Sequence, residues 1–191
     1  DDPSALDPVH DMIVIDHYGL NAAYERAARE RVGALGVFSD FPDRQHNCDV
    51  LIDQNIGRAP ADYAALVNPG CAVLAGSDYV LLQPIFRDAD RRDPAAVADK
   101  GRNLLVTLGA SDPENVTADI LSQLRGAVRP EWRIRVVLGP SYAHKSEISR
   151  LAGGWTALEI VDAPVDLYSS IRWADAVITA AGGTCWELCY M

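Results

Sequence analysis

The fold is decided by the stretch at positions 103–115, which reads NLLVTLGASDPEN. Its first part, Leu104 to Leu108, is an apolar run of the kind that favours a buried strand. A Gly-Ala-Ser-Asp-Pro turn follows, and the residues from Asn115 to Leu124 have helical spacing. The stretch therefore predicts a strand, a tight turn and the start of a helix.

This turn is a candidate phosphate site. The first N–H groups of a helix lack partners within the helix and lie at the positive end of its dipole, so they attract anions. The residues that would hold the phosphate are Gly109, Ser111 and Asp112. The alternative is an ordinary turn with Ser111 or Asp112 as N-cap and Pro113 at the first helical position. The stretch lacks the full glycine pattern of a dinucleotide-binding or P-loop motif.

Length and composition indicate a globular protein. The chain has 191 residues, of which 49% are hydrophobic and 23% charged, which suits one large domain or two small ones. A net charge of -10 argues against a nucleic-acid partner. No apolar run is long enough to span a membrane and no signal peptide is visible, so we expect a cytoplasmic protein without membrane insertion.

The cysteines and histidines give no metal signal. No Cys-x-x-Cys pair and no metal-ligand spacing of His, Cys and Asp occurs, so we expect no metal and no cofactor. Reduced, buried thiols are the simplest interpretation of the four cysteines, Cys48, Cys71, Cys185 and Cys189. Three histidines are expected on the surface or in turns: His10, His46 and His144.

Both ends of the chain look cut. The chain starts at Asp1 without a methionine and stops at Met191 inside an apolar helical run. We therefore expect a fragment of a longer protein, in which any site shared with other segments is incomplete.

Strand and helix patterns alternate along the chain. The first half predicts strands at 11–15, 35–38, 50–52 and 72–75 and helices at 20–35 and 62–66. The second half predicts strands at 104–108, 134–138, 158–161 and 176–179 and helices from 115, at 145–151, at 166–174 and from 185. Such alternation predicts an α/β protein with two Rossmann-like halves and parallel sheets. We expect a partial N-terminal domain at 1–87, a linker at 88–100 and a partial C-terminal domain at 101–191.

Polar residues follow three strands of the first half. These positions matter because ligands of α/β sheets bind at the carboxyl ends of strands. His17 stands beside a carboxylate and a phenol and can exchange a proton near neutral pH; the alternative is a structural histidine that orients the turn. The candidate residues are Asp16, His17, Tyr18 and Gly19 after the first strand, Asp40 after the second and Asn55 after the third.

A second small-residue turn, Gly182-Gly183-Thr184, follows the last predicted strand and precedes a helix. Two such turns on neighbouring parallel strands would direct two helix N-termini at one crevice. Glu187 suits the two hydroxyls of a ribose, because a carboxylate offers only acceptors. The alternative is a capping box formed by Thr184 and Glu187.

Four motifs, taken together and in this order, resemble a known family. They are VIDHYGL at 14–20, CDVLIDQN at 48–55, LVTLGASDP at 105–113 and AGGTCWEL at 181–188. The chain is similar to the UDP-sugar hydrolases of pseudaminic acid biosynthesis and to their relatives in spore-coat and surface-polysaccharide clusters. The last two motifs are shared with the wider GT-B superfamily, which includes the lipid II-forming N-acetylglucosaminyltransferase.

The resemblance implies a GT-B fold, with two Rossmann-like domains, each incomplete here, and a nucleotide sugar bound between them. It implies attack of water at the anomeric carbon of a UDP-linked diacetamido-trideoxy sugar, with release of UDP. Its catalytic residues would be Asp16, His17 and Tyr18, with Gly19, Asp40 and Asn55 toward the sugar. The diphosphate would contact Gly109, Ser111, Asp112, Gly182, Gly183 and Thr184, and the ribose Glu187.

One departure from the family pattern affects activity. The family's catalytic base is a histidine in a Gly-x-Gly-His type loop, which would precede Asp1 and is absent. We therefore expect this chain to bind a nucleotide weakly and not to catalyse. Two alternatives stay open: a GT-B glycosyltransferase with a UDP-sugar donor, and a non-catalytic module that binds nucleotide sugars.

Overall fold

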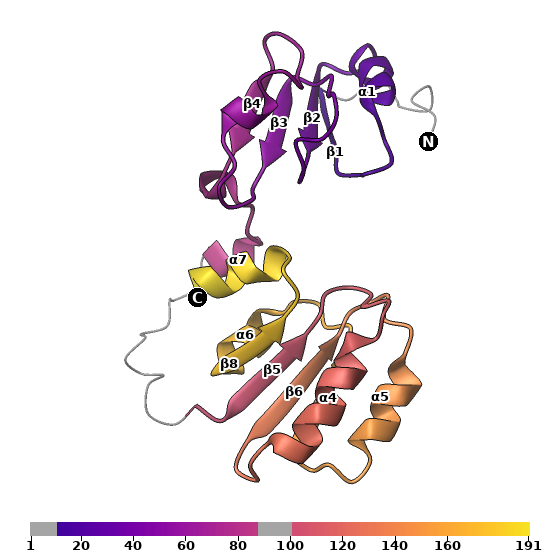
Figure 1. The fold of residues 1–191 in the computed structure, drawn as a ribbon, viewed down its shortest axis with the longest axis vertical. Coiled ribbons are helices and arrows are strands. Elements are labelled where there is room, and N and C mark those ends of the chain that lie inside the picture. Colours follow the sequence, from indigo (N-terminus) through magenta and orange to yellow (C-terminus); the bar gives the residue numbers. More distant parts are fainter. Residues whose placement is uncertain (1–10, 88–100) are drawn as a thin grey trace. The chain divides into compact units, whose positions relative to one another are not determined.

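The computed structural model describes residues 11–87 and 101–191. The chain divides into two compact units, with the boundary in the sequence between Leu81 and Leu82. Each unit holds one four-stranded parallel sheet (Figure 1). The alternation of strand and helix patterns therefore predicted the α/β class and the two parallel sheets correctly. The predicted linker at 88–100 lies outside the described residues.

The sheet of the first unit has its strands in chain order, β1 (Met12–Ile15), β2 (Ala34–Phe38), β3 (Val50–Asp53) and β4 (Ala72–Ala75). Its core lies between the sheet and α1 (Ala22–Arg29), with Ala28, Leu35 and Leu51 fully buried. Asn21 begins α1, because its side chain accepts hydrogen bonds from the amides of Ala23 at 3.0 Å and Tyr24 at 3.2 Å.

Two helices predicted in the first half are shorter in the structure. The helix expected at 20–35 ends at Arg29, because the chain must turn to enter β2. The turn is tight: a Cβ atom at Gly33 would lie 2.5 Å from the carbonyl oxygen of Asp11. The helix expected at 62–66 is a 3₁₀ helix, Pro60–Tyr63, whose start is fixed by Asp62 accepting from the amide of Ala59 at 2.9 Å.

The sheet of the second unit has the order β7-β6-β5-β8, built from β5 (Asn103–Thr107), β6 (Arg133–Leu138), β7 (Leu158–Asp162) and β8 (Ala176–Thr179). Its helices are α2 (Pro84–Arg87), α4 (Val116–Ala127), α5 (Lys145–Ala152), α6 (Tyr168–Trp173) and α7 (Gly183–Tyr190). The last helix begins two residues before the predicted position.

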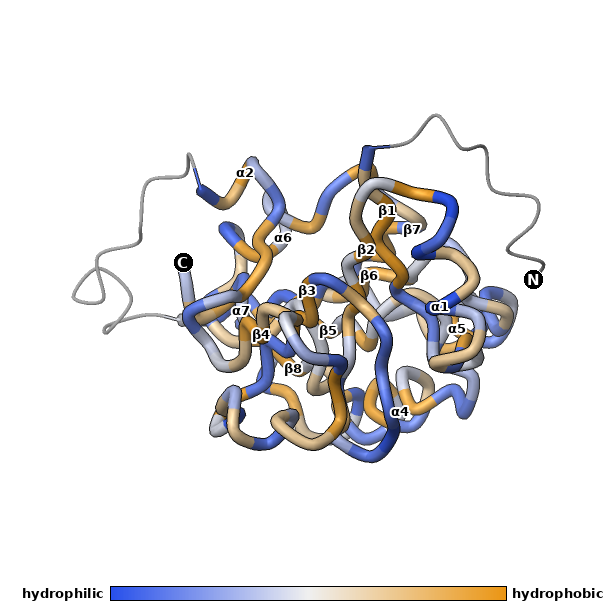
Figure 2. Tube along the Cα trace, turned by 90° about the horizontal axis from the view of Figure 1, so that it is seen from above, coloured by the Kyte–Doolittle hydropathy of each residue, from blue (hydrophilic) through white to orange (hydrophobic). Residues whose placement is uncertain are grey.

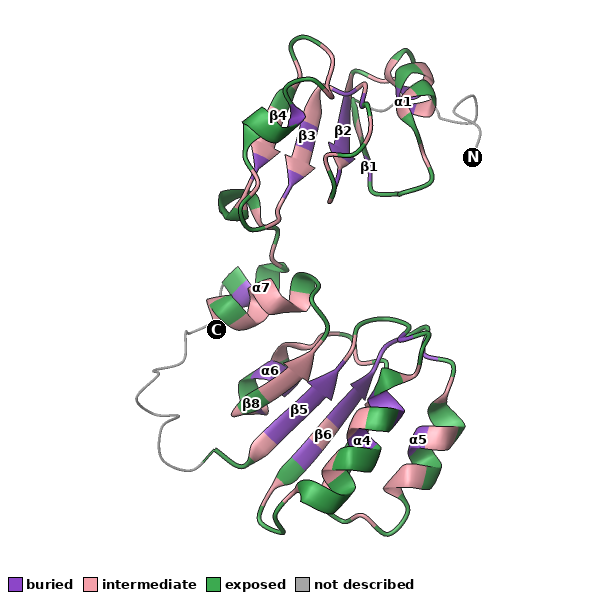
Figure 3. Ribbon diagram, in the orientation of Figure 1, coloured by how far each residue is buried: buried purple, intermediate pink, exposed green. Residues whose placement is uncertain are grey.

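Both faces of this second sheet are covered. Val106 packs with Leu121 of α4 and Ile148 of α5 on one face, whereas Leu105 packs with Phe86 and Ile171 on the other. Figure 3 shows β5 and β6 buried and the outward sides of α4 and α5 exposed. Burial on both faces explains why the sequence of β5 is a continuous apolar run.

Hydropathy follows the same division. In Figure 2 the strands are mostly hydrophobic and many of the connecting loops are hydrophilic. Among the described residues, no helix has the length and apolar character needed to cross a membrane.

Candidate functional site

The carboxyl edge of the first sheet gathers three of the predicted residues into one hydrogen-bonded chain. The hydroxyl of Tyr18 donates to the carboxylate of Asp40. The side-chain amide of Asn55 donates to the carbonyl oxygen and to Oδ1 of Asp40, at 3.3 Å each. The parallel register brings them together, since β1, β2 and β3 end side by side. This edge therefore presents a phenol, a carboxylate and an amide in fixed positions.

The buried Asp53 anchors this set of hydrogen bonds through Asn55. Its side chain is 1% exposed and accepts from the Asn55 amide N–H at 2.9 Å and from Asn55 Nδ2 at 2.8 Å. It also accepts from the hydroxyl of Tyr63 at 2.8 Å and pairs with Arg58 Nε at 3.1 Å. Asp53 belongs to the motif at 48–55 but was not among the predicted site residues. The available signal was an acidic residue two positions after Leu51, on the buried face of a strand, where a carboxylate needs partners.

Two phenols of this edge keep their protons. Burial raises the pKa of Tyr63 to about 12, and the nearby Asp53 carboxylate acts in the same direction. The hydrogen bond to Asp40 raises the pKa of Tyr18, whose ring is 76% exposed. Both hydroxyls are therefore donors at neutral pH.

The turn after β1 is held by His17. The amide of Gly19 donates to Nδ1 of His17 at 3.0 Å, which makes this ring nitrogen an acceptor. A Cβ atom at Gly19 would lie 2.9 Å from Cε1 of the same ring. This is the geometry expected of a histidine that orients its turn. Asp16, His17 and Gly19 are exposed, and Nε2 of His17 has no partner among the residues that the structure describes.

In the second unit, Asp112 is turned into the start of α4. Its carboxylate accepts from the amides of Val116 at 3.0 Å and Thr117 at 2.8 Å, and the residue is 8% exposed. Burial alone would raise the pKa of Asp112, but the hydrogen bonds from Thr117 and Val116 outweigh it and hold the pKa below its usual value. The carboxylate thus occupies the donors at the start of α4 that could otherwise face an anion.

The turn that precedes Asp112 still has open donors. The amides of Gly109, Ala110 and Ser111 make no hydrogen bond within the described part of the chain. Gly109 has a φ of 85°, a conformation that glycine adopts without strain. The segment after β6 packs closely against this turn: a Cβ atom at Gly139 would lie 2.4 Å from the carbonyl oxygen of Gly109 and 2.3 Å from that of Ala110, and the amide of Ser141 donates to the Ala110 oxygen at 3.0 Å.

The turn after β8 is the more open one. Gly182 is the N-cap of α7 and provides no side-chain hydrogen bond. Apart from the adjoining backbone, no atom of the described residues lies within 4 Å of a Cβ built at Gly182 or Gly183. The amides of Gly183 and Thr184 make no hydrogen bond among the described residues. The N-terminus of α7 therefore offers uncapped donors to a ligand.

The two turns leave neighbouring strands. Thr107, at the end of β5, is the register partner of Thr179, at the end of β8. Both turns therefore follow the same edge of the sheet, as sequence analysis expected for parallel neighbours. The two strands belong to the same sheet, within the second compact unit.

Glu187 lies in the first two turns of α7 and is partly buried. Its carboxylate has no hydrogen-bond partner in the described residues, and burial raises its pKa. The alternative of a capping box with Thr184 is not what the structure contains: α7 begins at Gly183, so that Thr184 lies inside the helix. A partly buried carboxylate without a partner among the described residues is available to a ligand.

Two predictions outside the site are wrong. His46 is buried, not on the surface, and its Nδ1 lies 3.0 Å from the carboxylate of Glu25, which is also buried. This pair ties the segment before β3 to α1. Of the four cysteines, which were expected to be buried, only Cys48 is fully so, and Cys189 is exposed.

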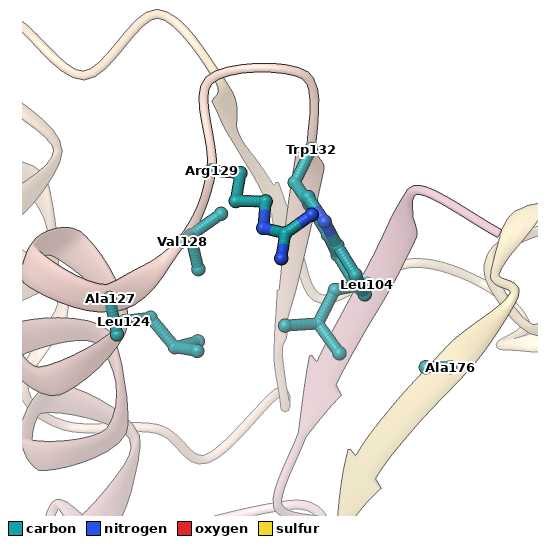
Figure 4. Close-up of a pocket in the computed structure, with 7 residues that line it drawn as sticks. All are labelled: Leu104, Leu124, Ala127, Val128, Arg129, Trp132 and Ala176. Atoms are coloured by element: carbon teal, nitrogen blue, oxygen red, sulfur yellow. The ribbon is translucent and has the colours of Figure 1, made fainter. Parts of the chain in front are cut away.

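A pocket of about 330 Å³ lies at the opposite edge of the second sheet (Figure 4). It includes Leu104 and Ala176, register partners at the amino ends of β5 and β8, whereas both turns follow the carboxyl ends. Its other lining residues are Leu124, Ala127, Val128, Arg129 and Trp132. This pocket is therefore separate from the candidate site. Among the described residues, no cluster of three or more His, Cys, Asp or Glu side chains could hold a metal ion.

The fold and these edges define an α/β protein with two parallel-sheet units, each with polar groups at the carboxyl ends of its strands. No family model matches the chain. It is 26% identical to the UDP-2,4-diacetamido-2,4,6-trideoxy-beta-L-altropyranose hydrolase of Campylobacter jejuni over 114 residues, which is 60% of this chain and 40% of that protein. It is 26% identical to the spore coat polysaccharide biosynthesis protein SpsG of Bacillus subtilis over 116 residues, 60% of this chain and 34% of that protein.

A third relative extends over more of the sequence. An uncharacterized protein of Methanocaldococcus jannaschii is 23% identical over 192 aligned positions, which cover 95% of this chain and 38% of that protein. The chain thus spans no more than 40% of the length of these curated relatives. It is a distant homologue of a sugar-nucleotide hydrolase and of a polysaccharide biosynthesis protein.

Proposed function

We propose that the chain binds a UDP-linked sugar and is part of an enzyme that hydrolyses the sugar's anomeric C–O bond. The substrate class is a UDP-linked diacetamido-trideoxy sugar, and the products are UDP and the free sugar for pseudaminic acid biosynthesis. The name of the Campylobacter relative supports this choice of substrate, as do the four sequence motifs. Distant identity alone carries little functional weight, so the residues of the site must support the assignment.

In this proposal the second unit binds the nucleotide. Open amides at Gly109 and Ser111 and the N-terminus of α7 at Gly182 to Thr184 would bind the diphosphate. Backbone donors suit a chain with a net charge of -10, which has few cations to spare for phosphate. The carboxylate of Glu187 would accept from the two ribose hydroxyls.

The first unit is assigned the sugar. Tyr18, Asp40 and Asn55 form a connected set of donors and acceptors, which suits the hydroxyl and acetamido groups of such a substrate. Asp16 and His17 are exposed beside this set, and Nε2 of His17 has no partner among the described residues. In this proposal they orient the sugar and the attacking water.

The chemistry divides between the two sets of residues. Hydrolysis needs a group that activates water, and UDP leaves with negative charge. Preorganised amides at the two turns would stabilise that charge as the C–O bond breaks. The base that activates water belongs, by the resemblance, to a loop outside this chain.

One observation carries the proposal: α7 begins without a side-chain cap, directly after a strand that pairs with β5, and Glu187 lies unpaired one turn into the helix. Uncapped donors and a free carboxylate on one short helix match a phosphate joined to a diol. This arrangement suits a ribose diphosphate.

Calorimetric titration of the chain with UDP tests the assignment, with UMP and GDP for comparison. We expect UDP to bind more tightly than both, since UMP lacks one phosphate and GDP carries another base. Equal binding of UDP and GDP would contradict a uridine site. Absence of UDP binding by the folded chain would overturn the assignment of the second unit.

A pair of glycine variants localises the site. Gly182→Leu places a side chain in open space beside the uncapped amides, and we expect it to weaken UDP binding by about tenfold or more, which is about 1.4 kcal/mol. Gly126→Leu is the control, because Gly126 also has open space around it but lies near the end of α4. Equal effects of the two variants would place UDP elsewhere.

Hydrolysis and transfer are separated by the acceptor. A hydrolase releases UDP from the diacetamido sugar nucleotide in water alone, so UDP release by a protein that includes the N-terminal loop is the expected result. UDP release that requires an added sugar or lipid acceptor would indicate a glycosyltransferase. Binding without any release would indicate a non-catalytic module.

A further inference from the structure

Two thiols face each other in the first unit. The Sγ atoms of Cys48 and Cys71 are 3.6 Å apart, with Cys48 buried and Cys71 partly exposed. Cys48 precedes β3, and Cys71 immediately precedes β4, its parallel neighbour. The pair therefore lies at the amino edge of the sheet, whereas Asp53 lies at the carboxyl edge.

Backbone contacts fix this approach. The amide of Cys48 donates to the side-chain oxygen of Asn68 at 2.9 Å, and the amide of Cys71 donates to the backbone oxygen of Asn68 at 3.2 Å. The amide of Ala72 donates to the oxygen of Asp49 at 2.8 Å, which sets the register of the two strands at this point. One residue, Asn68, thus holds both cysteine backbones, and the two sulfur atoms meet as a consequence.

We propose that Cys48 and Cys71 are a redox modification site that forms a reversible disulfide with a peroxide as oxidant. A disulfide has an S–S bond of about 2.05 Å, so the two sulfur atoms must approach by about 1.5 Å. Rotation about the side-chain bonds supplies a movement of this size. The pair is 23 positions apart in sequence, which explains why motif spacing gave no sign of it.

The reaction balances in two steps. The thiolate of Cys71, the more exposed thiol, attacks one peroxide oxygen; the O–O bond breaks, water leaves and Cys71 becomes a sulfenic acid. The thiolate of Cys48 then attacks the Cys71 sulfur, the S–O bond breaks and a second water leaves. The two thiols lose two electrons and two protons, and the peroxide is reduced to two waters. Burial raises the pKa of both thiols, so the reaction is expected to accelerate as the pH rises.

The Cys48–Cys71 disulfide is expected to change the stability of the first unit more than the residues at the carboxyl edge of its sheet. It links the amino ends of β3 and β4 and closes the chain between them, which restricts the unfolded state. Neither cysteine contacts the carboxyl-edge residues Tyr18, Asp40 or Asn55 in the hydrogen bonds of the described residues. Oxidation is therefore expected to strengthen the first unit and to leave UDP binding by the second unit unchanged.

The experiment exposes the 191-residue chain to hydrogen peroxide, unfolds it in denaturant with an alkylating reagent that blocks every free thiol, and digests it with trypsin without reductant. Cleavage after arginine places Cys48 in peptide 45–58 and Cys71 in peptide 59–87. We expect these two peptides to appear linked, with a mass lower by two hydrogen atoms than their sum. Dithiothreitol should separate them.

The other thiols provide the controls. Cys185 and Cys189 fall together in peptide 173–191, so the double variant C185S/C189S should still form the linked pair. C71S should not form it. If C71S does not fold, the alkylation of Cys48 in the peroxide-treated wild-type chain decides the question: protection that dithiothreitol removes supports the bond, and full alkylation contradicts it.

A melting curve provides the second readout. The oxidised chain is expected to melt about 5 °C or more above the reduced chain, with the gain lost on reduction. A fully alkylated Cys48 after peroxide treatment, a Cys71 found only as sulfinic acid, or a bond that involves Cys185 or Cys189 would each overturn the proposal.

Discussion

The carboxyl edges of the two sheets present different chemistry. In the first unit, the side chains at the strand ends bond to one another, from Tyr18 through Asp40 and Asn55 to the buried Asp53. In the second unit, the edge presents backbone amides without partners among the described residues. They are those of Gly109, Ala110 and Ser111 after β5 and those of Gly183 and Thr184 after β8. One edge is satisfied internally and the other is open.

This difference in hydrogen bonding indicates which ligand groups each edge can bind. A connected side-chain network has its groups fixed before the ligand arrives, so it suits the orientation of neutral hydroxyl and amide groups. Open amides at a helix start have water as their only partner until an anion replaces it, so they suit phosphate.

Removal of the buried carboxylate should break the first edge. Asp53→Ala removes the acceptor of the Tyr63 hydroxyl and the charge partner of Arg58, and we expect a loss of about 3–5 kcal/mol in the free energy of unfolding of the first unit. Urea unfolding followed by hydrogen exchange of β3 peptides measures it. Asp43→Ala is the control, because Asp43 is exposed, and should change stability by less than about 0.5 kcal/mol. Equal effects would show that Asp53 does not organise this edge.

Loss of the free carboxylate should weaken nucleotide binding at the second edge. Glu187→Ala removes the proposed ribose acceptor, and we expect the Kd of UDP to rise by about 5- to 150-fold, which is about 1–3 kcal/mol. Calorimetry measures the Kd, with Glu131→Ala as the control at an exposed position before β6. An unchanged Kd would refute the ribose assignment.

The same carboxylate predicts a pH effect on binding. Burial raises the pKa of Glu187, so the ionised form that accepts from the ribose is lost at a higher pH than for a free glutamate. UDP affinity of the wild-type chain should therefore fall as the pH is lowered through this raised pKa. The Glu187→Ala variant should lack that step, and a step that persists in the variant would belong to another group.

Loss of the cap should destabilise α4 by a smaller amount. Asp112→Ala removes the acceptor for the amides of Val116 and Thr117, and we expect a loss of about 1 kcal/mol in the free energy of unfolding. The folded pKa of Asp112 is lowered, so its contribution is present above the unfolded pKa and is lost as the pH falls through the folded pKa. Denaturation of both proteins across this range should show the wild-type advantage disappear in acid. A constant difference would assign the effect to packing.

The smallest stability effect is expected at Tyr18. Its ring is 76% exposed, so Tyr18→Phe should change the free energy of unfolding by less than about 0.5 kcal/mol while removing the donor to Asp40. UDP binding should stay the same, because the second unit carries it. A loss of UDP affinity in this variant would end the division of roles between the two edges.

Sequence patterns predicted the strands well because their apolar runs are long and local. The run before Gly109 marks β5 to within one residue, and the β8 turn was recognised by its small residues. Helix α1 was overestimated, since composition favours a helix up to Leu35 whereas the close approach of Gly33 to Asp11 forces a turn. Such a contact between distant segments has no local signature.

The site residues divide in the same manner. Asp40 and Asn55 could be singled out because each follows a strand, but their mutual hydrogen bonds depend on the sheet register. The role of Asp53 depends on Tyr63 and Arg58, which approach it only in the folded unit. The direction of Asp112, into its own helix instead of toward a ligand, is likewise set by backbone geometry, with a φ of 38°.

Strand β5 has a consequence for the breathing motions of the second unit. It lies between β6 and β8, and Leu105 and Val106 are fully buried beneath the helices on its two faces. Its amides are therefore expected to open to solvent late, whereas the amides of Gly109, Ala110 and Ser111 have no hydrogen bond among the described residues. Local stability is therefore expected to drop sharply between β5 and the turn that follows it, so that a turn able to adjust to a ligand is attached directly to a stable strand.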